Sequence, residues 1–211
     1  MNKLILDVEA LPTKHIYDIG YVIVDKYFNI KTQKHFIVKQ VYENSLSYQT
    51  AYYKEKKPLY VSLLKGRKAK KTHYGHIMRS LTADIKKYAV KEWYAFNSDY
   101  DKSALQISCE WFKINNPLKD IQEYDIRKIA MPIYENEKYQ LMCSENGFTT
   151  PKGYIKTTAE TTYAYLTKQP KFKEDHMGLH DALIETEILE QAFLLGGNKK
   201  ETRSPFIKAL T

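Results

Sequence analysis

Residues 3–9 read Lys3-Leu4-Ile5-Leu6-Asp7-Val8-Glu9, an apolar run that ends in two acids separated by a single residue. The apolar part is typical of a short buried strand. Residues two apart on a strand point to the same face, so we expect Asp7 and Glu9 side by side where this strand ends. Two carboxylates this close repel each other, and burying them is costly unless a cation lies between them. Taken alone, such a pair is more often two solvated loop acids, but it also fits a site for Mg²⁺ or Mn²⁺.

The chain around this stretch predicts a mixed sheet with helices packed on it. Residues 16–25 and 34–39 are rich in β-branched and aromatic residues, so with residues 3–6 they predict a three-strand meander. Residues 40–75 have no sustained period, and we predict some helix there without defined ends. Beyond them, helices and strands alternate, which indicates an α/β fold. We expect helices at 75–88, 100–112, 127–134, 139–146 and 177–195, strands at 91–96 and 122–125, and a capping box from Thr157 (N-cap) to Glu160.

A second acidic cluster follows the strand predicted at 91–96. The segment Phe96-Asn97-Ser98-Asp99-Tyr100-Asp101 lies where a helix begins, and an acid there sits at the positive end of the helix dipole. Asp101 could be a simple helix cap, and Asp99 is a rival for the same role.

A third cluster stands at the entrance to the last long helix. His176 and Asp181 are five residues apart, so a histidine in the entry loop and an acid one turn inside the helix can face one site. His180 and Glu185 have the same spacing and are the alternative pair. We prefer His176 and Asp181 because they keep an aspartate and place the histidine before the helix.

Composition fits one folded domain with a localised positive charge. The 211 residues are 43% hydrophobic and 27% charged, and the net charge is +8. Residues 54–71 hold eight basic residues against the single acid Glu55, which suits a polyanion partner or a solvated loop. We predict a single domain at 1–197, with a basic segment at about 40–75, and a loose polar tail at 198–211. Two cysteines, no membrane-spanning run and no signal peptide predict a protein of the reducing cytoplasm without a membrane partner.

Together, the three clusters resemble the motifs of the DEDDh (DnaQ-like) 3′→5′ exonuclease superfamily. Asp7-Val8-Glu9 resembles its first motif, Asn97 through Asp101 its second, and His176 through Asp181 its third. The similarity covers roughly residues 3–195, and the chain resembles phage-encoded members of the family in particular. The resemblance implies a ribonuclease H-like mixed sheet and hydrolysis of DNA or RNA from the 3′ end, preferably of single strands, with release of nucleoside 5′-monophosphates.

The resemblance also implies roles for single residues. Two Mg²⁺ or Mn²⁺ ions would be held by four acids, with His176 as the general base. Leu11 would wedge between bases or lie in the core, and Phe96 and Tyr100 would stack on bases or pack as core aromatics. The metal ligands implied are Asp7, Glu9, Asp101 and Asp181, and the substrate-binding residues are Ala10, Leu11, Phe96, Asn97 and Tyr100.

The sequence departs from the family pattern in two places. Val8-Glu9-Ala10 replaces the familiar Thr-Glu-Thr, and Gly178 stands where alanine is common. Two other functions stay open: a non-catalytic nucleic-acid-binding protein on the same fold, and a ribonuclease H-like endonuclease. The resemblance leaves open a polymerase or replication partner, a monomer or a homodimer, and, for a phage-encoded chain, the host cytoplasm as location.

Overall fold

The first three strands form an antiparallel meander in the computed structural model, which describes residues 1–209. Strands β1 (Lys3–Ala10), β2 (Ile16–Val24) and β3 (Ile30–Val38) pair in sequence order. Strand β3 begins four residues earlier than predicted, because residues 30–33 are mostly polar and mostly exposed, while the second half of the strand is buried. The predicted meander is confirmed.

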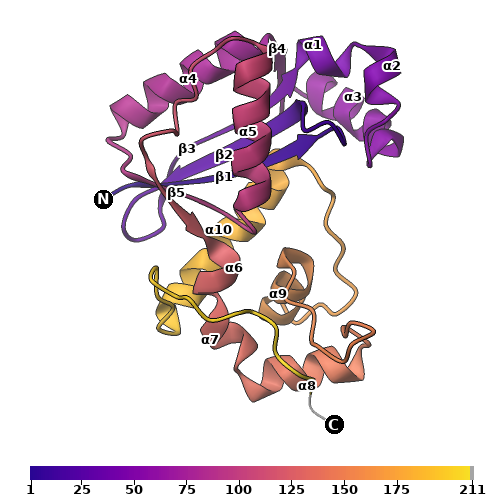
Figure 1. The fold of residues 1–211 in the computed structure, drawn as a ribbon, viewed down its shortest axis with the longest axis vertical. Coiled ribbons are helices and arrows are strands. Elements are labelled where there is room, and N and C mark those ends of the chain that lie inside the picture. Colours follow the sequence, from indigo (N-terminus) through magenta and orange to yellow (C-terminus); the bar gives the residue numbers. More distant parts are fainter. Residues whose placement is uncertain (210–211) are drawn as a thin grey trace.

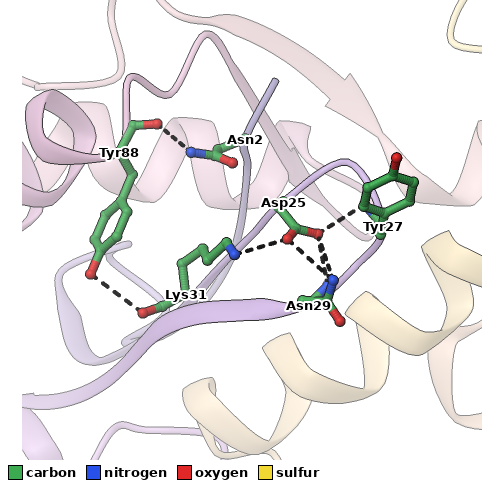
Figure 2. Close-up of polar contacts among 6 residues, drawn as sticks. All are labelled: Asn2, Asp25, Tyr27, Asn29, Lys31 and Tyr88. Carbon is green, nitrogen blue, oxygen red and sulfur yellow. Dashed lines mark hydrogen bonds and ion pairs between the residues drawn. The ribbon is translucent and has the colours of Figure 1, made fainter.

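The turn between β2 and β3 is closed by one aspartate. Asp25 Oδ1 accepts hydrogen bonds from the backbone N–H groups of Tyr27 (2.9 Å) and Asn29 (3.0 Å), and its Oδ2 pairs with Lys31 Nζ at 2.9 Å (Figure 2). On the same side, Tyr88 accepts from Asn2 and donates to the carbonyl of Lys31. Lys31 and the hydrogen bonds from Tyr27 and Asn29 hold the pKa of Asp25 below its usual range.

Three further strands complete a six-stranded sheet in the order β4-β3-β2-β1-β5-β6. Strands β5 (Glu92–Ala95) and β6 (Gln122–Asp125) continue the sheet parallel to β1. The short strand β4 (Lys70–Thr72) lies parallel to β3 at the other edge and was not predicted. The mixed α/β sheet with helices around it is confirmed.

Helices cover both faces of the sheet, and β1 divides its side chains between them. Leu4, Leu6 and Val8 pack with helices α4 (Tyr74–Lys87) and α5 (Asp99–Trp111). Ile5 packs on the opposite face, which helix α10 (Gly178–Leu194) covers (Figure 1). Because side chains alternate along a strand, Asp7 and Glu9 share the face of Ile5 and therefore face α10.

The basic segment folds into short helices above the end of the sheet. It comprises α1 (Lys39–Tyr42), α2 (Ser45–Tyr48), the 3₁₀ helix η1 (Lys54–Lys56) and α3 (Lys57–Lys65). Buried tyrosines hold it to β2: Tyr17 meets Tyr48 and Tyr60 edge-on, with ring centroids 5.3 and 6.0 Å apart. These tyrosine contacts give the segment a packed core, although its sequence is mostly polar.

Four small helices extend the face of α10 away from the sheet (Figure 1). They are α6 (Ile126–Ile129), α7 (Met131–Tyr134), α8 (Glu137–Glu145) and α9 (Ala159–Leu166). The predicted capping box is wrong by one residue, because Thr158 caps α9 and accepts from Thr161 N (3.2 Å). Thr157 is buried instead and accepts hydrogen bonds from Arg127.

The C-terminal stretch returns to the body of the protein. Helix α10 ends where Gly196 adopts a left-handed conformation (φ +88°), as the glycine pair predicted. Lys199 Nζ then pairs with the carboxylate of Glu92 at 2.6 Å, and Ile155 N donates to Ile207 O. The described part of the tail is therefore attached rather than loose, and residues 210–211 lie outside the described residues. Within residues 1–209, no helix combines the length and apolar character that crossing a bilayer requires.

Candidate metal centre

The first two acids lie at the end of β1, at an irregularity in its pairing. The register between β1 and β2 shifts between Glu9 and Ala10, so the regular ladder stops just after Glu9. Asp7 is half-buried, yet its Oδ2 is buried without a hydrogen-bond partner. Burying a carboxylate oxygen without a hydrogen-bond partner costs free energy, so a ligand such as a cation would stabilise this atom.

Two helix starts bring the other two acids to β1. Asp101, in the first turn of α5, is 3% exposed, and its Oδ1 accepts from Val8 N at 3.0 Å. Asp181, in the first turn of α10, accepts from Met177 N at 2.9 Å through Oδ2, while its Oδ1 is buried without a partner. The rival Asp99 is exposed. The Val8 hydrogen bond thus ties Asp101, rather than Asp99, to the strand that carries the first two acids.

The third predicted motif places His176 beside these acids. Ligand atoms of Glu9, His176 and Asp181 all lie within 4.8 Å of one another. His176 has a left-handed backbone (φ +50°) and lies two residues before α10 begins. His180 is exposed and its Nδ1 lies 3.0 Å from Asp175 Oδ2. Of the two histidines weighed in the sequence, His176 is the one among the acids.

Electrostatics mark this cluster as strained without a cation. Burial, with the charges of the neighbouring acids, raises the pKa of Asp7 well above its usual range. Burial is also the main cause that raises the pKa of Glu9 to about 10, of Asp101 to about 8 and of Asp181 to about 7. Protonation at neutral pH is what isolated buried carboxylates do when no cation neutralises them.

The donor set fits hard divalent cations. Four carboxylates supply only oxygen ligands, and buried oxygens of Asp7 and Asp181 have no protein partner. Oxygen-rich sites of this kind select Mg²⁺ or Mn²⁺. The residues present therefore fit the ions that the sequence predicted, with Asp7, Glu9, Asp101 and Asp181 as the residues that would hold them.

A close backbone contact fixes α10 against the sheet. A Cβ on Gly20 of β2 would lie 1.9 Å from Leu179 N, so only glycine allows this approach. Gly178 is equally confined, because its Cβ would lie 2.5 Å from Gly20 N. Asp18 Oδ2 accepts from Gly178 N (3.1 Å) and from the Tyr60 hydroxyl (2.9 Å). The glycine at 178, which departs from the family pattern, thus has a packing reason.

The predicted substrate-binding residues fall into two groups. Ala10 and Leu11 are buried, at 2% and 3% exposure, and Leu11 packs in the core below the centre. Asn97 is exposed with a left-handed backbone (φ +61°). Phe96 and Tyr100 are half-buried, and the charges of Glu9 and Asp101 add to burial in raising the pKa of Tyr100 to about 12. Tyr100 is partly exposed near Glu9 and Asp101, and Asn97 is exposed at the end of β5, whereas Leu11 is a core residue.

Three further residues lie at the centre that the sequence did not assign to the preferred motifs. The Tyr53 ring stacks on His176 (centroids 4.1 Å apart, planes 9° apart), and Lys56 Nζ donates to the carbonyl of Asp175. Both lie in the basic segment, for which the sequence predicted some helix but not where it begins and ends. Glu185 lies one helical turn beyond Asp181 and is 3% exposed. Its i+4 spacing from Asp181 was visible in the sequence, but only as part of the alternative motif.

Comparison of the sequence with protein-family models and with characterised proteins finds no match. Solved structures do match the fold. The nuclease domain of 3′hExo, a DEDDh family member, bound to rAMP, superimposes with a TM-score of 0.63 at 14% identity, over 96% of each chain. Cell-death related nuclease 4 (CRN-4) gives a TM-score of 0.59 at 15% identity, over 93% of this chain and 64% of that one. Exonuclease I of E. coli in complex with a dT13 oligonucleotide gives 0.53 at 13%, over 94% and 41%.

These neighbours establish the class of fold. The chain has the ribonuclease H-like α/β fold of DEDDh nucleases, as its three sequence clusters predicted. Its length corresponds to the nuclease domain of 3′hExo, whereas it spans under two thirds of CRN-4 and less than half of Exonuclease I.

Proposed function

We propose that this chain is a divalent-metal-dependent exonuclease that shortens DNA or RNA, preferably single-stranded, from the 3′ end and releases nucleoside 5′-monophosphates. The observation that carries the proposal is the gathering of Glu9 and Asp181 around His176, with buried, unpaired oxygens on Asp7 and Asp181, on a nuclease fold. Asp101 joins them through its hydrogen bond to Val8. The neighbours' bound molecules, rAMP and an oligonucleotide, are of the expected substrate class.

The four acids would hold two Mg²⁺ or Mn²⁺ ions, which, when bound, supply Lewis-acid stabilisation of a phosphodiester. His176 accepts the proton of the attacking water. Burial and the positive charge of Lys56 lower the pKa of His176, which keeps its ring neutral and able to accept a proton at pH 7. The stacked Tyr53 holds the ring plane, and burial raises the pKa of this tyrosine to about 12, so the phenol stays neutral.

The substrate surface surrounds this group. Tyr100 lies beside the acids, and Lys14 Nζ is 4.5 Å from its ring centroid. An aromatic ring and a cation are therefore both available to a bound substrate. Such a pair suits a nucleotide, whose base stacks and whose phosphate is anionic. Asn97, exposed at the end of β5, would contact the same terminal nucleotide.

The test is degradation of matched DNA and RNA oligonucleotides labelled at the 5′ end. We expect a ladder that shortens from the 3′ end with Mg²⁺ or Mn²⁺, nucleoside 5′-monophosphates as products, and no cleavage with EDTA. A circular single strand should stay intact, and its cleavage would instead identify an endonuclease. Asp101→Asn should be inactive, whereas its matched control Asp99→Asn, which changes an exposed acid two residues away, should be active. Binding without degradation by the wild type would indicate a non-catalytic nucleic-acid-binding protein.

A further inference from the structure

Glu185 is a buried carboxylate that the four-acid centre does not use. It lies on α10 one turn after Asp181 and is 3% exposed. Its Oε2 is buried with no hydrogen-bond partner, and none of the ion pairs among residues 1–209 includes it. Most neighbouring buried positions of α10 are apolar, for example Ile184 and Ile188, and the buried Thr186 donates its hydroxyl to the carbonyl of Ala182. An ordinary core position would hold an apolar side chain here as well.

The surroundings of Glu185 place it against the acids. Residues four apart on a helix share a face, so Glu185 follows Asp181 toward β1. Apart from burial, the charges that raise the pKa of Glu185 are those of Asp101, Asp181 and Glu174. The charge of Glu185 also raises the pKa of Asp7, and it does so more than the charges of Asp181 and Glu9. The carboxylate, which accepts a hydrogen bond from the backbone N–H of Phe96 but has no cationic partner among residues 1–209, therefore approaches the cluster from the α10 side, near Asp7 and Asp101.

We propose that Glu185 is a fifth carboxylate of the metal centre, whose charge strengthens the binding of divalent cations by the other four. This inference rests on the proposed function, since it presumes that cations occupy the centre. A buried carboxylate that has no cationic partner in the protein is stabilised when a metal cation binds nearby, and the cation is stabilised equally in return. Glu185 is a positioning and charge-compensating residue in this account, and contact with the substrate is not required of it.

The experiment is calorimetric titration of the metal-free protein with Mn²⁺. Glu185→Gln keeps the shape and removes the charge, and we expect its dissociation constant for Mn²⁺ to rise about 10- to 100-fold over the wild type. Glu190→Gln, a half-buried glutamate on the same helix, is the matched control and should bind Mn²⁺ as the wild type does. If the glutamine variant does not fold, Glu185→Leu replaces it, because leucine suits a buried helical position. Its dissociation constant should rise by a similar factor.

The outcomes separate this inference from the proposed function. Weak Mn²⁺ binding only in the Glu185 variants supports a fifth carboxylate. Wild-type affinity in either folded Glu185 variant overturns it and leaves Glu185 as a protonated space-filling residue. Absence of Mn²⁺ binding in the wild type itself would instead overturn the metal-dependent function.

Discussion

The candidate metal centre and the segment of short helices at 39–65 meet at His176, yet they are built in opposite ways. Each acid of the centre lies at the end of a strand or in the first turn of a helix that packs on the sheet. The helical segment has no strand ladder of its own and is held by tyrosine rings, among them Tyr42 and Tyr60, 5.8 Å apart. The centre consists of acidic residues, and the segment contributes the ammonium group of Lys56 and the ring of Tyr53. The four candidate ligands are thus positioned by the sheet and by helices packed on it, whereas Tyr53 and Lys56 come from a segment outside the sheet.

The largest expected effect is the loss of an acid from the centre. Asp7→Asn or Asp181→Asn should lower nuclease activity by more than the about 10- to 100-fold typical of residues that only support a metal ligand. Thermal stability without metal should stay the same at neutral pH and rise at higher pH, because each change removes a buried carboxylate that repels its neighbours once it is ionised. The matched control is Asp175→Asn, which changes an exposed acid beside His176. A parallel loss of activity and folding would show that these acids are structural.

The next effect separates the two histidines. His176→Ala should lower turnover about 10²- to 10⁴-fold while leaving Mn²⁺ binding largely intact, since the change removes a base and keeps all four acids. Turnover and calorimetry on the same preparation measure this. His180→Ala is the control, because this ring is exposed and pairs with Asp175. Normal turnover in the His176 variant, with loss in the His180 variant, would reverse the assignment.

A third change tests the close contact between β2 and α10. Gly20→Ala should lower the free energy of unfolding by about 3 kcal/mol or more, because the added carbon overlaps the backbone of α10 and cannot be relieved by a side-chain movement. Gly75→Ala is the control, since its Cβ would meet only a side-chain atom, Ile114 Cδ1, at 3.3 Å. Denaturant unfolding gives both values. Equal stability of the two variants would show that α10 is not locked onto β2.

The pH dependence of stability reports the charge of the centre directly. Burial holds the pKa of Asp181 near 7, of Asp101 near 8 and of Glu9 near 10, whereas these groups titrate near pH 4 when unfolded. The folded protein therefore binds more protons, and the stability of the metal-free protein should fall as pH rises from about 5 to about 8. The slope is about 1.4 kcal/mol per pH unit for each such group. Mn²⁺ should flatten this slope, and a metal-free stability that rises over the same range would contradict the burial of these acids.

The smallest effect belongs to the helical segment. Tyr53→Ala should lower turnover by about tenfold or less, because aromatic stacking is worth about 0.5–1.5 kcal/mol. Tyr53→Phe keeps the ring and should retain turnover, which separates stacking from the hydroxyl. A loss in Tyr53→Ala as large as that in His176→Ala would mean that the segment is as essential as the sheet.

The same contrast explains what the sequence could reveal. The meander and the three acidic clusters were predictable, because each is a local pattern: alternation along a strand, or an acid at a helix start. Strand β4 was not, since Lys70–Thr72 is short, polar and partnered only by the edge of β3. Tyr53 reaches His176 through a fold over more than a hundred residues, which no local pattern encodes. The choice of Thr157 over Thr158 failed because adjacent threonines fit the same capping spacing, and only tertiary contacts distinguish them.

The most direct measurement is the position of Mn²⁺ in crystals of the wild-type protein, located by anomalous scattering. We predict density bounded by Asp7, Glu9, Asp101 and Asp181, absent from Asp7→Asn crystals grown under the same conditions. Mn²⁺ density only elsewhere, or none at concentrations that saturate calorimetric binding, would contradict the claim that these acids form a metal centre.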